Sequence, residues 1–181
     1  IHISAGAVVF TGTITNNGQV KLTNGASAQF STPLVLGPSS PLRGVGTITA
    51  PSVTAAGEVS PGVSPGALHI TGDLTLLATS SLLIEIGGPT QGTSYDFLSA
   101  GGSGSLGGNL QITFLNDYGW NVPPNATFTV MNASNGLTGA FANVAPGQRL
   151  FTFDGVGSFQ VNYGVSSLFA PGSVVLSSFA T

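Results

Sequence analysis

The stretch that decides the fold prediction is GEVSPGVSPGALHITGDLTL, residues 57–76. It holds two Ser-Pro-Gly tripeptides, Ser60-Pro61-Gly62 and Ser64-Pro65-Gly66. Proline presets φ to about −65° at a turn and glycine accepts the positive φ beside it, so each tripeptide predicts a corner. Apolar residues then alternate with polar ones on both sides of a glycine, at Leu68, Ile70, Leu74 and Leu76. The stretch therefore predicts consecutive sides of a repeating β-structure and not a loop.

Short alternating runs of this kind recur along the chain, and no window has the apolar spacing of an amphipathic helix. The runs are separated by glycine, asparagine or proline, as in NNGQ (16–19), TNGA (23–26) and GVGT (44–47). Short strands at regular spacing fit a β-sandwich or a β-solenoid, in which successive turns of the chain stack as rungs. The shortness of the runs and the sharpness of their turns favour the solenoid.

The composition is consistent with stacked rungs. Charged residues make up only 5% of the chain, whereas an average soluble domain has about 25%. Equivalent outward positions on neighbouring rungs lie about 4.8 Å apart, so like charges would repel there. Serine, threonine and asparagine avoid that repulsion and can hydrogen-bond along the stack.

The same composition excludes several classes of function. The net charge is −3, and the three cations, Lys21, Arg43 and Arg149, are scattered along the sequence. Nucleic acids and anionic membranes are bound by clustered cations, and no apolar run is long enough to cross a bilayer as a helix. We therefore expect no nucleic-acid partner and no membrane insertion. The absence of cysteine fits a secreted or cell-surface protein, and the start at Ile1 fits a mature product or a fragment.

The chain is expected to form one structural unit with two parts. Residues 1–95 carry the regular spacing and are predicted to be solenoid rungs. Residues 96–181 hold most of the aromatic residues and are predicted to continue the solenoid or to form a β-rich cap, with a small sandwich as one possibility. Within this part, Phe151–Phe153 and Phe159–Val161 alternate around DGVG and predict a hairpin.

The order of several motifs resembles the β-helical stem near the C-terminal end of autotransporter passenger domains and of other large bacterial surface proteins. The resemblance covers about residues 40 to 181 and rests on the stretch quoted above, followed by SLLIEIGG (81–88), YDFLSAGGSGSLGGNLQITFLN (95–116) and ATFTVMNASNGLTGAFANV (126–144). It implies a right-handed single-stranded β-helix that is secreted and serves as a non-catalytic stalk. It implies no active-site residues.

The titratable residues offer little chemistry. Of the six carboxylates, Glu85 and Asp96 come together if their strands stack, and a polysaccharide-cleaving enzyme would depend on such a pair. The favoured interpretation places each at a turn or outward position, with Asp96 accepting hydrogen bonds from local backbone amides. His2 and His69 are the only histidines, too few for a metal site. We expect no catalytic residues, no cofactor and no metal.

Two aromatic residues are candidates for sugar binding. Tyr118 and Trp120 lie in NDYGWNVPPN, residues 116–125, beside two prolines. If exposed, they could stack on the rings of cell-surface glycans. The favoured interpretation is that Trp120 closes the end of the core or contacts a neighbouring subunit.

The most informative feature for function is the N-terminal segment IHISAGAVVF, residues 1–10. It is apolar and alternating, and it contains no charged residue or proline that would protect an edge strand. We therefore expect Ile1, Ile3, Val8, Val9 and Phe10 to contact another copy of the chain. The sequence predicts an extracellular structural protein, a subunit of a self-assembling fibre, surface layer or stalk. The alternative is a carbohydrate-binding or adhesin module.

Overall fold

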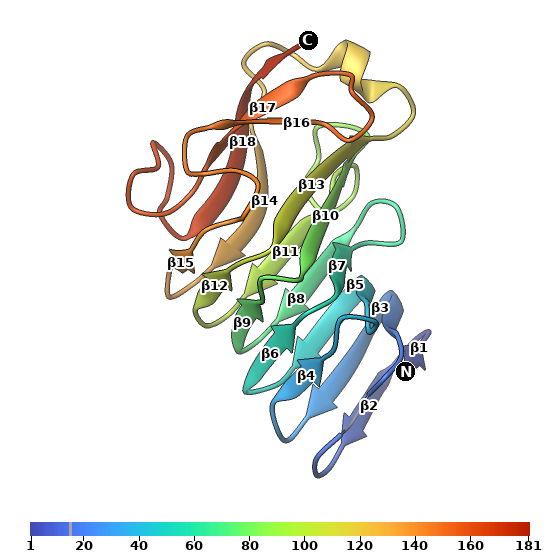
Figure 1. Ribbon diagram of the computed structural model, residues 1–181. Coiled ribbons are helices and arrows are strands. Elements are labelled where there is room, and N and C mark those ends of the chain that lie inside the picture. The colour runs from blue at the N-terminus through green and yellow to red at the C-terminus, as the bar shows by residue number, and fades with distance from the viewer. Residues whose placement is uncertain (15) are drawn as a thin grey trace.

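The computed structural model describes residues 1–14 and 16–181 and confirms the all-β prediction. Strands account for 51% of the residues and helix for 2%, so the short 3-10 helix η1 (Tyr118–Asn121) is a local turn within a β-protein. The strands follow one another as a stack from the N-terminal to the C-terminal end (Figure 1).

Up to residue 139 the chain runs alternately along two sheets, and one passage along both is called a rung here. The larger sheet takes β1 (His2–Ile3), β2 (Ala7–Phe10), β3 (Val20–Phe30), β5 (Leu42–Thr49), β7 (Glu58–Pro61), β8 (Ala67–Ile70), β10 (Ser81–Ile86), β11 (Phe97–Ala100), β13 (Asn109–Phe114) and β14 (Phe128–Ala133). The smaller sheet takes β4 (Leu34–Leu36), β6 (Ser52–Ala55), β9 (Asp73–Leu76), β12 (Gly104–Leu106) and β15 (Leu137–Gly139). The chain ends with β16 (Arg149–Phe151), β17 (Ser158–Asn162) and β18 (Ser173–Ala180), which join the larger sheet.

The core consists of ladders of apolar side chains at equivalent positions of successive rungs. The strands that form them pair in parallel and in register. One fully buried ladder runs through Val20, Leu42, Val59, Leu82 and Leu110. A slip by one residue would turn polar side chains such as Lys21 and Arg43 into the core, so the alternating pattern sets the register.

The larger sheet forks at β5. The first half of β5 pairs with β7 and its second half with β8. One arm continues as β7, β10 and β13, and the other as β8, β11 and β14. The segments that join the two arms lengthen along the stack, through residues 62–66, 87–96 and 115–127.

The fork corrects the prediction of two corners in residues 57–76. Ser60 and Pro61 lie within strand β7, so there is one turn here, and it returns the chain to the same sheet. Gly62 and Gly66 meet at its base, where a Cβ on Gly66 would lie 2.9 Å from the Cα of Gly62. Because the two ends of the turn touch, β7 and β8 follow one another along the same edge of β5 and are not consecutive sides of a rung.

The C-terminal strands nearly close the larger sheet into a barrel. Strand β18 pairs antiparallel with β14, β17 with β18, and β16 with β17. The backbone N–H of Phe153, just beyond β16, then donates to the carbonyl of Ile112 in β13 at 2.7 Å. The sheet is therefore mixed, and the expectation of a purely single-stranded parallel solenoid does not describe the whole chain.

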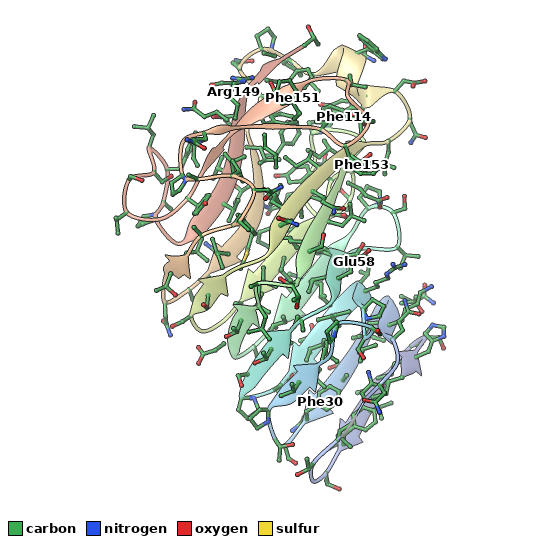
Figure 2. The ribbon with its side chains drawn as sticks, in the orientation of Figure 1. Phe30, Glu58, Phe114, Arg149, Phe151 and Phe153 are labelled. Atoms are coloured by element: carbon green, nitrogen blue, oxygen red, sulfur yellow. The ribbon has the colours of Figure 1, made fainter. Side chains whose placement is uncertain are left out.

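Aromatic side chains explain this departure. As the two arms separate, the space between β13 and β14 becomes too wide for the aliphatic ladders to fill. Phe114, Phe128, Phe159 and Phe179 fill it, with ring centroids 4.8 to 5.8 Å apart in the contacting pairs. Strands β17 and β18 cover this cluster, which lies at the end of the stack opposite Phe30 (Figure 2).

We expect Gly44→Ala to destabilise the fold by about 3 kcal/mol or more, because strain and overpacking add there. Gly44 has a φ of +118°, and a Cβ there would lie 1.8 Å from the carbonyl oxygen of Leu22 on the neighbouring rung. Gly6→Ala is the matched control, because Gly6 also has a positive φ but no atom lies within 4 Å of its Cβ position. Urea unfolding of both variants measures the difference, and equal losses of stability would contradict this account of the rung contact.

Candidate functional site

The free side of β2, here called the N-terminal edge, is the strongest candidate site for association. Strand β2 pairs with β3 on one side, where the carbonyls of Gly6 and Phe10 accept from Ser27 and Ser31 at 2.8 and 3.2 Å. Because main-chain groups alternate along a strand, those of Ala7 and Val9 point away from β3. No strand within the described ranges, 1–14 and 16–181, pairs with β2 on that side.

The five residues expected to contact another copy occupy different positions at this edge. Ile3 is only 6% exposed and packs into the core with half-buried Ile1. Phe10 is half-buried and stacks on Phe30 with ring centroids 4.8 Å apart. Val8 and Val9 are exposed, by 39% and 60% of their surface. Only these two present much apolar surface to a partner.

Val8 lies in register with Ala28, which belongs to a fully buried ladder. Ala28 pairs with Ile48 and Ile48 with Ile70 on the following rungs. Val8 thus occupies a core position of the stack that no described rung of this chain covers.

In the larger sheet, β13 is the last strand of one arm of the fork, and its free edge is occupied. The Asn143 side chain acts as a substitute for a neighbouring strand, because its Oδ1 accepts from the N–H of Leu110 at 3.0 Å and its Nδ2 donates to the carbonyl of Leu110 at 2.8 Å. Asp154 accepts from the N–H of Phe114 at 2.7 Å. The free edge of β2 and the occupied edge of β13 are therefore chemically different ends of the larger sheet.

The Asp96 carboxyl group is fully buried where the two arms of the fork separate. Its Oδ1 accepts from the N–H of Gly66 at 2.8 Å, just before β8, and its Oδ2 accepts from the N–H of Glu85 at 2.9 Å, within β10. Burial raises the pKa of Asp96 to about 7, although these two hydrogen bonds act in the opposite direction. The carboxyl group thereby ties one arm of the sheet to the other.

Glu85 and Asp96 are close in the structure, as stacking of their strands predicts, but they do not form an open catalytic pair. Asp96 is inaccessible to solvent and both of its oxygens accept backbone hydrogen bonds, whereas Glu85 is partly exposed on the outer face. A glycosidase needs two carboxyl groups that flank a bound sugar. In this arrangement Asp96 can position backbone but cannot reach a substrate.

Most of the remaining charge gathers in a shallow groove on the outer face of the larger sheet. The groove has a volume of about 230 Å³ and is lined by Lys21, Arg43, Glu58 and Glu85, among others. Arg43 and Glu58 form an ion pair with 2.8 Å between Nη2 and Oε1. Because charges of both signs lie together, the groove is not a cationic surface of the kind that binds polyanions.

The structure separates the two residues considered for sugar stacking. The Tyr118 ring packs edge-on against Phe114 and Phe128, with centroids 6.4 and 6.5 Å away, so its surface is used within the core. Trp120 is 70% exposed and lies beside a shallow pocket with Val122 and Phe179. Both belong to η1, but only Trp120 is available to a ligand.

Other kinds of site find little support in the described part of the chain. Residues 1–14 and 16–181 contain no group of three or more His, Cys, Asp and Glu side chains placed to hold a metal ion. His69 is exposed and its Nδ1 lies 2.8 Å from the Oγ of Ser99. Within the same ranges, no helix has the length and apolar character needed to span a membrane.

The expectation that Asp96 accepts hydrogen bonds from backbone amides is confirmed, but these amides lie 11 and 30 residues away and the side chain is buried, not outward. Asp96 in YDFL was a detectable signal, because a single acid stands within an apolar run. Asn143 and Asp154 carried no such signal, since their hydrogen bonds reach 33 and 40 residues along the chain. The exposure of Phe151 and Phe153 also could not be read from an alternating pattern that equally suits a covered hairpin.

Comparisons of the chain with protein-family models, with curated proteins and with solved structures found no match.

We expect the free energy of unfolding to fall as the pH rises from about 4 to about 7. The pKa of Asp96 is raised from 3.8 to about 7 in the folded chain, so across this window the folded state holds a proton that the unfolded state releases. Asp96→Asn should remove the slope. It should also cost about 1–3 kcal/mol, because the amide NH₂ would face a backbone donor.

Urea unfolding at a series of pH values measures both effects. Glu85→Gln is the matched control, because it removes a neighbouring carboxylate and leaves the buried one, and it should retain most of the slope. The same pH dependence in the parent chain and in Asp96→Asn would show that another group is responsible.

Proposed function

We propose that this chain is a non-catalytic structural segment of an extracellular assembly, such as a stalk, surface layer or fibre. In this proposal the rungs from β1 to β15 form a right-handed single-stranded β-solenoid, and the barrel-like part at the C-terminal end closes it. Association takes place through the N-terminal edge. The observation that carries the proposal is the difference between these two ends of the larger sheet: β2 has a free edge, whereas β13 is occupied by Asn143 and Asp154.

The chemistry of the N-terminal edge supports pairing with another strand. The backbone groups of Ala7 and Val9 are directed outward, and an unpaired strand edge is a template for strand addition. Val8 would become a core residue if a further rung covered it, because it lies in register with buried Ala28. A strand added here would therefore gain both hydrogen bonds and apolar burial.

The outer surface supports a structural role as well. On the smaller sheet, Thr54, Thr75, Ser105 and Thr138 lie in register on successive rungs. Their hydroxyl groups can stack without charge repulsion. A surface of this kind can extend over many rungs, which suits a stalk more than a site for ionic ligands.

The occupied C-terminal end determines the form of self-association that we expect. A head-to-tail fibre through the larger sheet would need an open edge at both of its ends, and β13 does not provide one, although β15 is a terminal strand of the smaller sheet. Two copies can instead pair through their N-terminal edges around a two-fold axis, which makes a closed contact. Growth into a filament would need a second contact elsewhere on the surface.

The test is Val9→Pro, with Val9→Thr as the matched control. The N–H of Val9 points to the free edge, so proline there removes an edge donor and leaves the bonds between β2 and β3 intact. A two-fold contact would lose two hydrogen bonds of about 1 kcal/mol each, which weakens association roughly tenfold or more. Val9→Thr keeps the donor and the β-branched shape and should associate like the parent chain.

Sedimentation equilibrium over a range of concentrations, with negative-stain electron microscopy, measures the outcome. We expect a concentration-dependent larger species for the parent and for Val9→Thr, and a predominantly monomeric Val9→Pro with unchanged thermal unfolding. A parent chain that stays monomeric at every concentration, or a Val9→Pro variant that associates normally, would refute association through this edge.

A further inference from the structure

Two phenylalanine rings are exposed at the seam where the larger sheet nearly closes. Phe151 and Phe153 are 75% and 82% exposed, although most other phenylalanines of the chain are buried or half-buried. Full burial of one such ring would remove about 150–250 Å² from water. An uncovered pair of this size on one short segment is typical of a surface that contacts a ligand.

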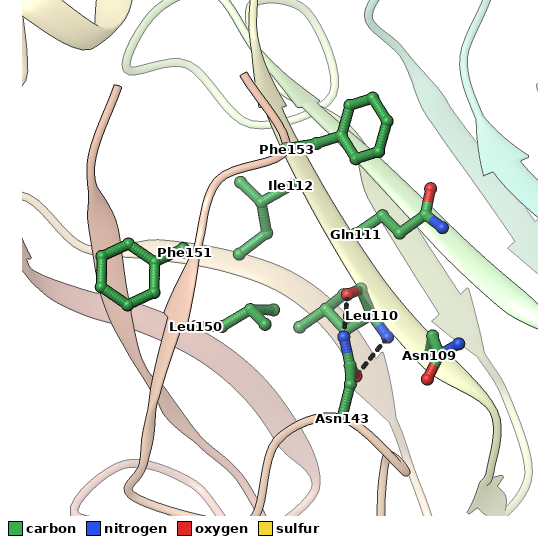
Figure 3. A pocket seen from close by; sticks show the side chains of 8 residues that line it. All are labelled: Asn109, Leu110, Gln111, Ile112, Asn143, Leu150, Phe151 and Phe153. Carbon is green, nitrogen blue, oxygen red and sulfur yellow. Dashed lines mark hydrogen bonds between the residues drawn. The ribbon is translucent and has the colours of Figure 1, made fainter. Parts of the chain in front are cut away.

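The two rings border a groove of about 240 Å³ between β13 and the segment from Leu150 to Phe153. Figure 3 shows the rings on opposite sides of the groove, with Leu110, Ile112 and Leu150 between them. The volume is below the roughly 300–1,000 Å³ of sites that enclose a drug-sized molecule. The groove is therefore suited to a short part of an extended ligand that continues across the surface.

The polar side chains of the groove are amides. Asn109 and Gln111 line it on the side of Phe153, and Asn143 is bound to the backbone of Leu110 (Figure 3). No charged side chain is among the eight lining residues. Amides donate and accept hydrogen bonds without charge, so the groove favours a neutral ligand rich in hydroxyl groups.

The backbone that carries the two rings is held in place before any ligand binds. The N–H of Phe153 donates to Ile112 at 2.7 Å, and the adjacent Asp154 accepts from Phe114 at 2.7 Å and from Val156 at 3.1 Å. Phe151 is fixed by the pairing of β16 with β17. A preorganised site loses little conformational entropy on binding.

We propose that this seam groove binds a neutral saccharide chain. Sugar rings present apolar C–H faces and peripheral hydroxyl groups, which match the two phenylalanine rings and the amides of Asn109 and Gln111. An acidic polysaccharide would need cations, and Arg149, the nearest in sequence, is occupied by the carbonyls of Ser158 and Ser178 at 2.8 and 2.7 Å. The site is distinct from Tyr118 and Trp120, and the proposal does not rest on association through the N-terminal edge.

The experiment titrates the full chain with cellohexaose, chitohexaose and a linear mannan oligosaccharide, with polygalacturonate as the acidic comparison. Calorimetry gives affinities, and the side-chain amide signals of Asn109 and Gln111 in NMR spectra report on the groove itself. We expect saturable binding of at least one neutral oligosaccharide, with shifts of those two amide signals.

Three variants locate the site. Phe151→Ala with Phe153→Ala should weaken binding roughly tenfold or more, since both aromatic contacts to the sugar are removed. Gln111→Met keeps the shape of the side chain without its hydrogen bonds and should weaken binding severalfold. Trp120→Ala is the matched control, because it removes an exposed ring away from the seam, and it should bind like the parent chain.

Four outcomes would overturn the proposal. They are no binding of any neutral oligosaccharide, equal binding by the double phenylalanine variant, loss of binding in Trp120→Ala alone, and polygalacturonate binding as tight as that of the neutral chains. If the double variant instead changes the sedimentation of the protein, the groove is a contact between copies and not a saccharide site. Thermal unfolding checks the fold, which these exposed rings should barely affect.

Discussion

The buried carboxyl group of Asp96 is the interaction on which the arrangement of the larger sheet depends. It accepts one hydrogen bond from each arm of the fork, from Gly66 beside β8 and from Glu85 within β10. The two arms also share β5 and a backbone hydrogen bond from the N–H of Asp96 to the carbonyl of Glu85 at 3.0 Å, and the carboxyl group adds a bond to each arm. Gly62 is constrained as well, because a Cβ there would lie 2.5 Å from Oδ1 of Asp96. This contact lies where the continuous sheet separates into two arms.

The widening of the fork leads to the difference between the two ends of the molecule. Near the N-terminus, β3 and β5 are long and continuous, and a ladder of aliphatic side chains fills the core. At the other end, the separated arms need aromatic residues between them and antiparallel strands over them. The free strand edge therefore lies at one end and the exposed phenylalanine groove at the other. The association and the saccharide binding that we propose therefore use opposite ends of the molecule.

The scarcity of charge affects both surfaces. Uncharged ladders let rungs stack without repulsion, and they leave the protein dependent on apolar burial and backbone hydrogen bonds. Most of the few charged groups form ion pairs or hydrogen bonds with other groups of the same chain. Examples are the Arg43–Glu58 pair and the bonds that Asp154 accepts from backbone N–H groups. The recognition that we propose uses a strand edge, aromatic rings and amides, so we expect it to respond weakly to salt.

The sequence by itself determined the all-β class and the short strands. It also determined the inward positions, such as Leu68, Ile70, Leu74 and Leu76. It could do so because period-two alternation is a local property of the chain. It also indicated which segment lies at a vulnerable edge, since residues 1–10 contain no charge or proline. Only the tertiary structure decided that residues 57–76 contain one turn at a fork, that the larger sheet is mixed, and that Phe151 and Phe153 are uncovered. These features depend on contacts between residues about 30 to 40 positions apart, as for Gly66 with Asp96, Leu110 with Asn143 and Phe114 with Asp154. Local propensity carries no information about such contacts, because they form only after the rungs have stacked.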